Sequence, residues 1–174
     1  MLFKISNVKV SLTTSLVFLD NVSELASRQN LKYTKQKNFS VLKGKYTYTI
    51  FKTNKFGENH INITKIPLLD KVKDAVNYFL VLFNCKKIKC VIDNISATTF
   101  CGKQLNLREI VSIEKYKTID QFKTVKYNPE IFPGMFLKFK CGTVILFHSG
   151  KIVLIGCKKE SDLKCLIQNI YALI

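Results

Sequence analysis

Two stretches in the second half of the chain decide its fold: Tyr127-Asn-Pro-Glu-Ile-Phe132-Pro-Gly-Met135 and Val144-Ile-Leu-Phe147-His-Ser-Gly150-Lys-Ile-Val-Leu-Ile155-Gly-Cys-Lys158. The Pro133-Gly134 and Ser149-Gly150 pairs mark turns, and the apolar runs between them are typical of strands. Because side chains alternate along a strand, one face of the predicted sheet receives Ile145, Phe147, Val153 and Ile155. The second half of the chain is therefore rich in β-structure.

Working outward, the chain is an internal repeat of two half-chains. Each half closes with an apolar pattern that steps by 3, 1, 3, 1 and 3 residues. The matching positions are Val72, Ala75, Val76, Phe79, Leu80 and Phe83 in the first half and Leu163, Leu166, Ile167, Ile170, Tyr171 and Ile174 in the second. This spacing predicts an amphipathic helix at the end of each half.

Other segments match in the same order. Short alternating strands are predicted at residues 4–8 and 90–95, first helices at residues 19–26 and 105–111, and further strands at residues 47–51 and 143–147. Asp20 or Asn21 is the expected cap of the first helix, with Glu24 following. Tyr33 and Phe39 correspond to Tyr127 and Phe132.

The repeat sets the expected domain organisation. A first repeat spans residues 1–86 and a second spans residues 87–174, and a connection this short indicates that both share one sheet. Residues 112–126 have no counterpart in the first half, and they read either as an extension of a helix or as a surface loop.

The charge of the chain favours an anionic partner. Among its 174 residues, 28 Lys and Arg oppose 12 Asp and Glu, for a net charge of +16. With 47% hydrophobic residues the chain has ample surface to bury, which excludes intrinsic disorder. Nucleic acid or an acidic membrane is the expected partner class. Because lysine far outnumbers arginine, an AT-rich genome is an alternative origin of the charge.

Metal, membrane and enzyme chemistry are not indicated. The six cysteines form no Cys-x-x-Cys pair and only two histidines could join them, so no metal site is expected and the thiols are predicted to be reduced, small core residues. The longest apolar run, residues 78–83, is too short to span a bilayer, and the first residues alternate instead of forming an apolar signal segment. No acid-base pair, phosphate loop or nucleophile elbow is present, so neither an enzyme nor a cofactor is expected.

The two opening stretches closely resemble the second repeat of the TATA-box-binding protein family. That repeat reads tyrosine, variable, proline, glutamate, leucine, phenylalanine, proline, glycine, and later phenylalanine, variable, serine, glycine, lysine, hydrophobic, valine, leucine, threonine, glycine, alanine, lysine. With the internal repeat as a guide, the resemblance covers nearly the whole chain. It implies an α+β saddle of two pseudosymmetric repeats, with a curved antiparallel sheet and four helices on its convex face.

The resemblance also implies how DNA would be bound. Family members bind the minor groove with the concave sheet and wedge two pairs of phenylalanines into base steps, and the family is a well-known example of such kinking. The second pair falls on Phe132 and Phe147. By repeat correspondence the first falls on Phe39 and Phe51. The central asparagines of the family, which contact base edges, fall on Asn7 and Asn94.

The remaining site residues follow from the same resemblance. The groove-facing surface would include Lys9, Ser96, Thr64, Ile145, Val153 and Ile155. Backbone phosphates would be met by Lys138, Lys140, Lys151 and Lys158. Glu130 matches an acidic residue through which the family recruits transcription factor IIB, whereas Asn128 replaces another.

Several departures from the family pattern weaken the expectation of strict TATA preference. Ile155 replaces a threonine, and Lys9 and Ser96 each replace a valine. The strand pair between Phe39 and Phe51 is shorter than in the family, and residues 55–60 look inserted, so the first wedge is expected to be displaced.

The sequence thus predicts a transcription initiation factor that binds and bends A·T-rich promoter DNA and recruits factor IIB-like proteins and RNA polymerase. No membrane or small-molecule partner is expected. The alternative is a protein-interaction adaptor that has kept the saddle but lost DNA bending. A nuclear location is expected, or a cytoplasmic virus factory if the chain comes from a large DNA virus instead of a divergent AT-rich eukaryote.

Overall fold

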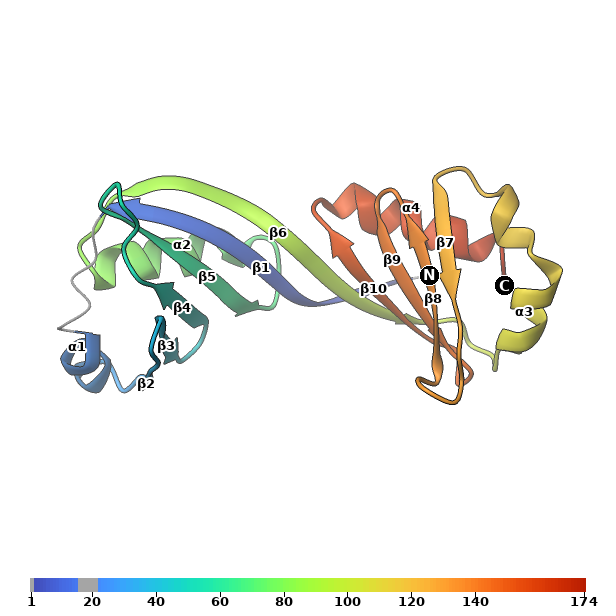
Figure 1. Ribbon diagram of the computed structural model, residues 1–174, viewed down its shortest axis with the longest axis horizontal. Coiled ribbons are helices and arrows are strands. Elements are labelled where there is room, and N and C mark those ends of the chain that lie inside the picture. Colours follow the sequence, from blue (N-terminus) through green and yellow to red (C-terminus); the bar gives the residue numbers. More distant parts are fainter. Residues whose placement is uncertain (1, 16–21) are drawn as a thin grey trace. The chain divides into compact units, whose positions relative to one another are not determined.

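The computed structural model describes residues 2–15 and 22–174, and these form an α+β fold (Figure 1). The elements are, in order, β1 (Lys4–Ser15), α1 (Val22–Arg28), β2 (Lys32–Lys35), β3 (Phe39–Lys43), β4 (Thr47–Phe51), β5 (Glu58–Ile66), α2 (Lys71–Leu82), β6 (Lys87–Phe100), α3 (Leu107–Ile113), a 3-10 helix (Lys115–Thr118), β7 (Phe122–Lys126), β8 (Gly134–Phe139), β9 (Gly142–Phe147), β10 (Lys151–Cys157) and α4 (Glu160–Tyr171). The strands are hydrogen-bonded in the order β2-β3-β4-β5-β1-β6-β10-β9-β8-β7.

The chain divides into two compact units, each with its own core. We call Asn7–Asp93 the N-terminal unit, and Asn94–Ile174 together with Met1–Ser6 the C-terminal unit. Strands β1 and β6 each contribute residues to both units. Both strands are longer than predicted from the sequence, with 12 and 14 residues.

In the N-terminal unit, helix α2 packs against β5 and closes the core. The buried residues of β1 alternate as Val8, Val10 and Leu12, which puts them on one face of the sheet. Tyr48 of β4 is buried among them, and its hydroxyl donates to the Ala75 carbonyl at 2.9 Å. Desolvation raises the pKa of Tyr48, so this hydroxyl remains a protonated donor.

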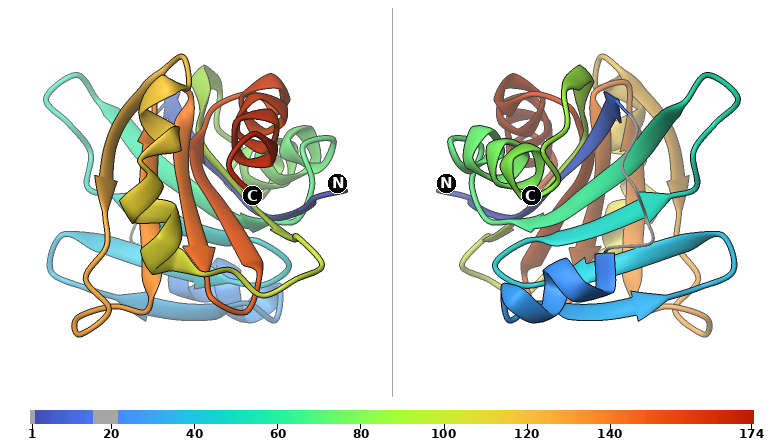
Figure 2. Two further views of the ribbon diagram at one scale, coloured as in Figure 1. Left: turned by 90° about the vertical axis from the view of Figure 1, so that its right-hand side faces the viewer. Right: turned by 90° about the vertical axis from the view of Figure 1, so that its left-hand side faces the viewer.

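In the C-terminal unit, helix α4 covers one face of β9 and β10 (Figure 2, left view). The helix buries Leu163, Leu166, Ile167 and Ile170. They share the core with Val144, Leu146, Ile152 and Leu154, the alternate residues of β9 and β10. Both predicted closing helices are confirmed, because each apolar stripe meets the inner face of its own sheet.

The first helices of the two halves are also present. Asn106 caps α3, and its side chain accepts from the Glu109 amide at 3.3 Å. The cap predicted at Asp20 or Asn21 lies outside the described residues. Glu24 pairs with Arg28 within α1 at 2.5 Å.

Residues 112–126 are neither an extended helix nor a plain loop. They contain the 3-10 helix and the edge strand β7, which pairs with β8. The edge position explains the missing sequence signal, because most residues of β7 are exposed and its pattern lacks apolar alternation.

The cysteines are free, but most are not core residues as predicted. Cys157 is buried, and desolvation raises its pKa to about 12. Cys90 is exposed on β6. Within residues 2–15 and 22–174, no cluster of His, Cys, Asp and Glu could hold a metal ion, and no described helix is long and apolar enough to cross a membrane.

The core contact of α2 gives a stability prediction. Phe79 is fully buried, and its ring centroid lies 5.2 Å from that of Tyr48. Replacing it in the Phe79→Ala variant should lower the free energy of unfolding by ~3–5 kcal/mol, because a cavity remains. Phe56→Ala makes the same change at a side chain that is 73% exposed and should alter stability by ~0.5 kcal/mol or less. Equal denaturation midpoints for the two variants would contradict this core.

Candidate nucleic-acid interface

Each unit has a second sheet face whose side chains alternate with the core residues. We call this the open face, because the helices α2 and α4 pack on the opposite side. In the N-terminal unit it is formed by Asn7, Lys9, Ser11, Thr13, Phe39, Val41, Thr47, Thr49, Phe51, His60, Asn62 and Thr64. In the C-terminal unit it is formed by Asn94, Ser96, Thr98, Phe136, Lys138, Thr143, Ile145, Phe147, Lys151, Val153 and Ile155.

The two predicted central asparagines occupy equivalent environments. The side-chain oxygen of Asn7 accepts from the Lys65 amide at 2.8 Å, and that of Asn94 accepts from the Gly156 amide at 2.6 Å. Each donor sits at an irregularity in the strand pairing, with φ values of +62° for Lys65 and +80° for Gly156. Fixing the amide oxygen on the backbone leaves the NH₂ group, a pure donor, for other partners. In Asn94 one of its two protons goes to the Ser96 hydroxyl at 2.9 Å, and the other remains for an outside partner.

These irregularities also align the two repeats residue by residue. Thr64 precedes Lys65 as Ile155 precedes Gly156. Their cross-strand partners are threonines in both units, since Thr64 pairs with Thr47 and Ile155 pairs with Thr143. Thr64 is therefore the open-face counterpart of Ile155.

In the C-terminal unit, Phe132 and Phe147 lie together at the end of β8 and β9. Their ring centroids are 5.9 Å apart with planes at 65°, and Phe132 remains 38% exposed. Gly134 makes the arrangement possible, because a Cβ atom there would lie 2.6 Å from Phe132 Cε1 and 2.8 Å from Ile145 Cγ2. The motif glycine thus provides the space in which the rings sit.

In the N-terminal unit, Phe39 and Phe51 are also 5.9 Å apart, with their planes at 48°. The detailed arrangement differs, however. Phe39 is itself the cross-strand partner of Phe51, whereas the partner of Phe147 is Gly134 and Phe132 comes from the preceding loop. Phe51 thus holds the strand position of Phe147, whereas Phe39 is displaced from that of Phe132 and takes the place of Gly134. The His60 and Phe51 ring centroids are 5.8 Å apart.

The four predicted phosphate-binding lysines are distributed along and around the sheet of the C-terminal unit. Lys138 and Lys151 are exposed residues of β8 and β10, on the open face. Lys140 lies in the turn after β8, and Lys158 follows β10. None of the four forms an ion pair with a carboxylate in the described part of the chain, so their charge is available to an outside anion.

Glu130 is exposed in the loop between β7 and β8. Its backbone amide donates to the Asn128 side chain at 3.1 Å, and the Phe132 amide donates to the Asn128 carbonyl at 3.0 Å. Asn128, which replaces an acidic residue of the family, therefore stabilises the loop that contains Glu130 and Phe132.

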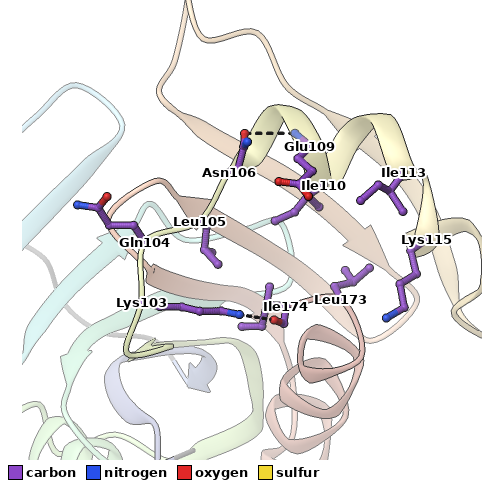
Figure 3. Close-up of a pocket in the computed structure, with 10 residues that line it drawn as sticks. All are labelled: Lys103, Gln104, Leu105, Asn106, Glu109, Ile110, Ile113, Lys115, Leu173 and Ile174. Carbon is purple, nitrogen blue, oxygen red and sulfur yellow. Dashed lines mark hydrogen bonds between the residues drawn. The ribbon is translucent and has the colours of Figure 1, made fainter.

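A cavity of about 380 Å³ lies between α3 and the end of α4 in the C-terminal unit (Figure 3). Its lining is mainly apolar, with Leu105, Ile110 and Ile113 on one side and Ile174 on the other. The Lys103 ammonium group donates to the Ile174 backbone oxygen at 2.7 Å. Glu109 provides the single carboxylate side chain among the lining residues that the structure describes, so the cavity offers no pair of acidic side chains for acid-base catalysis.

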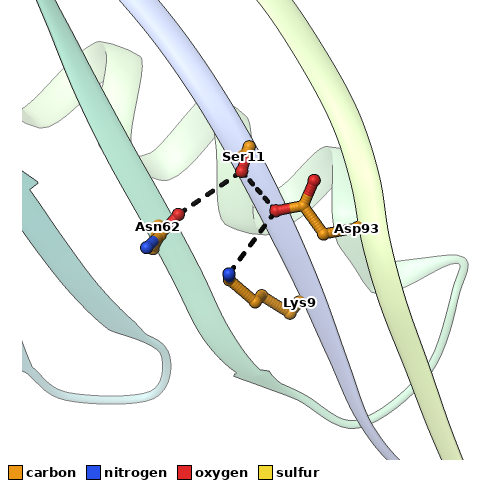
Figure 4. A network of polar contacts seen from close by, with 4 residues as sticks. All are labelled: Lys9, Ser11, Asn62 and Asp93. Atoms are coloured by element: carbon orange, nitrogen blue, oxygen red, sulfur yellow. Dashed lines mark hydrogen bonds and ion pairs between the residues drawn. The ribbon is translucent and has the colours of Figure 1, made fainter. Parts of the chain in front are cut away.

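A network on the open face of the N-terminal unit was missed by the sequence reasoning. Asp93 contacts Lys9 and Ser11, and Ser11 also contacts Asn62 (Figure 4). Strand alternation could have found Ser11 and Asn62. Asp93 could not have been found, because its position beside β1 depends on how the two long strands pair.

Comparison with known proteins shows which family the chain resembles. Residues 89–174 match the family model described as "Transcription factor TFIID (or TATA-binding protein, TBP)". The TATA-box-binding protein of Thermococcus kodakarensis is 33% identical over 95 residues, which cover 53% of this chain and 44% of that protein. That of Pyrobaculum aerophilum is 31% identical over 85 residues, covering 48% and 39%. The chain thus matches less than half the length of these relatives.

Similarity in structure extends further than similarity in sequence. The solved structure titled "Methanococcus jannaschii TBP" superposes with a TM-score of 0.70 at 26% identity, covering 97% of this chain and 95% of that one. The predicted α+β class, with its antiparallel sheet and four helices, is confirmed. The match is to a transcription factor family and not to an enzyme family, as expected. These relatives are archaeal and lend no support to a viral origin. The second half of the chain thus matches the TATA-binding protein family, and the fold is shared with an archaeal member along nearly the whole length, which makes the chain a distant homologue of the archaeal TATA-box-binding proteins.

Proposed function

We propose that this chain is a transcription initiation factor that binds A·T-rich promoter DNA through the minor groove and bends it. The observation that supports this most is the recurrence, on both open faces, of one asparagine held by a backbone amide and one close pair of phenylalanines. Folding alone does not require a partly exposed pair of aromatic rings on each open face. The recurrence of the pair in both units therefore favours a binding role.

The asparagines give the interface its chemistry. The minor groove presents acceptors at A·T pairs and adds the guanine amino group at G·C pairs. Because the Asn7 and Asn94 oxygens accept backbone amides, their NH₂ groups would face the groove as donors. Donors at the centre of the interface favour A·T pairs.

The phenylalanine pairs would supply the bend. Inserting apolar rings between base steps costs a few kcal/mol of stacking, which the added contact with bent DNA offsets. Phe132 and Phe147 suit this role because the ring of Phe132 is partly exposed at the end of its strand pair. Phe39 and Phe51 would form the second wedge, in which Phe39 is displaced because it pairs directly with Phe51.

Affinity would come mainly from the lysines. Phosphate neutralisation releases counterions and makes binding strongly salt-dependent without reading sequence. Lys138, Lys140, Lys151 and Lys158 are proposed for this role, and the open-face residues Lys9, Ser96, Thr64, Ile145, Val153 and Ile155 for contact with the groove.

The proposed partners follow from the same function. Promoter-bound chain would recruit a factor IIB-like protein through the loop that contains Glu130, together with other initiation factors and RNA polymerase. It would act where the promoter lies, in a nucleus, and needs no cofactor. The alternative function is an adaptor that binds protein partners without bending DNA. A measurement of DNA bending distinguishes the two functions.

Bending tests the wedge. Fluorescence energy transfer across an A·T-rich duplex should report a bend with the native chain. In the Phe132→Ala/Phe147→Ala variant the bend should be largely lost and affinity should fall at least ~10-fold, as expected from a few kcal/mol of wedge contact. Phe56→Ala, an exposed phenylalanine outside the open face, should leave both unchanged. Binding without any bend in the native chain would exclude the wedge and favour the adaptor.

Asn94 offers a test of donor chemistry. In Asn94→Asp the carboxylate can still accept the Gly156 amide, so folding is preserved, but the donors are lost and a negative charge faces the groove. Affinity for A·T-rich duplex should drop at least ~10-fold, in line with the ~1–3 kcal/mol of a good base contact. Asn106→Asp makes the same change at the α3 cap, where aspartate also caps well, and should bind normally. Equal affinities of the two variants would contradict the assignment of Asn94.

Salt dependence tests the phosphate contacts. Lys138→Ala should weaken binding to all duplexes alike and reduce the slope of log K against log salt by ~1. Lys164→Ala removes a charge from α4 that is paired with Glu160, and its slope should match that of the native chain. A native slope for Lys138→Ala would remove Lys138 from the interface.

A further inference from the structure

Four polar side chains from three strands meet on the open face of the N-terminal unit (Figure 4). The Lys9 ammonium group lies 3.7 Å from Asp93 Oδ2, and the Ser11 hydroxyl donates to the same oxygen. Ser11 Oγ lies 3.3 Å from Asn62 Oδ1. The Lys9 and Asp93 side chains are 39% and 32% exposed, so a ligand on this face can reach them. We call these four residues the Asp93 network.

The Asp93 carboxylate is unfavourable on a face that binds DNA, because both carry negative charge. Asp93 would be repelled by the phosphates unless its charge is compensated, and Lys9 provides that compensation within the unit. The pair is therefore neutral as a whole. What it adds to the face is hydrogen-bonding capacity and not net charge.

The number of donor protons in the network determines which of its oxygen atoms can still accept a hydrogen bond. The single hydroxyl proton of Ser11 goes to the charged acceptor Asp93, where the hydrogen bond is stronger. Ser11 Oγ can then only accept, although it faces Asn62 Oδ1. We therefore assign the Asn62 amide the orientation half a turn away, in which its NH₂ group donates to Ser11. The second Asp93 oxygen and the Asn62 carbonyl remain as acceptors on the open face.

The described part of the C-terminal unit has no such acceptor pair at the equivalent positions. There the counterpart of Lys9 is Ser96, two residues after the central asparagine. The cross-strand pair Ser11 and Asn62 corresponds to Thr98 and Val153. The two open faces therefore share their asparagines and aromatic pairs, but the N-terminal unit alone has a carboxylate and an amide at this place.

We propose that the Asp93 network is a specificity element that accepts a hydrogen bond from the guanine 2-amino group, so that the N-terminal unit takes a G·C pair in its part of the DNA site. This rests on the proposed minor-groove function. An A·T pair offers only acceptors there, which would leave the Asp93 and Asn62 oxygens unpaired. A G·C pair supplies the one donor that the minor groove contains.

Inosine isolates the group concerned, because an I·C pair differs from G·C only in lacking the 2-amino group. A G·C pair is moved step by step through an A·T-rich duplex, and at each position its affinity is compared with that of I·C. For at least one position the native chain should bind G·C ~5-fold to 10-fold more tightly, as expected for one good base contact. Asp93→Ala should lose this preference and still bind the all-A·T duplex.

The matched control is Asp74→Ala, which removes a half-exposed, lysine-paired carboxylate of α2 on the other side of the same unit. It should keep the preference for G·C over I·C. Equal or weaker binding of G·C than I·C at every position by the native chain would overturn the specificity element while leaving the proposed function intact. A preference that survives in Asp93→Ala would overturn it too. Failure of the native chain to bind any duplex would overturn the proposed function itself.

Discussion

The burial of one sheet face under a single long helix in each unit is the constraint on which the other features depend. In β1, Val8, Val10 and Leu12 are buried in the core with α2. Because side chains alternate along a strand, Asn7, Lys9 and Ser11 lie on the opposite face. The same reasoning applies to β9 and β10 beneath α4, where Ile145 and Val153 alternate with Leu146 and Leu154. The chemistry of the open face is therefore set by the residues that the core does not use.

The two units share the arrangement of their open faces but differ in some of the side chains. Both fix an asparagine oxygen on a backbone amide, and both bring two phenylalanines to 5.9 Å. They differ where the N-terminal unit has a lysine, an asparagine and an aspartate on its open face in place of small or apolar residues. The shared asparagines and phenylalanine pairs are consistent with one ligand that both units bind. The polar residues found in the N-terminal unit alone are consistent with a ligand whose two halves differ in sequence.

Much of the fold followed from the sequence, because its strongest patterns are local. The stripes that end in Phe83 and Ile174 predict α2 and α4, and the glycine pairs predict the turns around β9. The lengths of β1 and β6, the edge strand β7 and the exposure of Cys90 were not predicted, since none has a periodic apolar signal. The proposed site divides in the same way. Motif and repeat identify the phenylalanine pairs and asparagines, but the direct pairing of Phe39 with Phe51 and the contact of Asp93 with Ser11 arise from strand register, which the sequence does not reveal.

The central claim is that this chain reads DNA from the minor groove, and base replacement tests it most directly. Replacing every A·T pair of a bound duplex by I·C leaves acceptors in the minor groove but changes the hydrogen-bonding pattern of the major groove. Titration of the native chain against both duplexes at one salt concentration should give affinities that agree within ~2-fold, because the groups that Asn7 and Asn94 would meet are unchanged. Loss of binding to the I·C duplex would contradict minor-groove recognition.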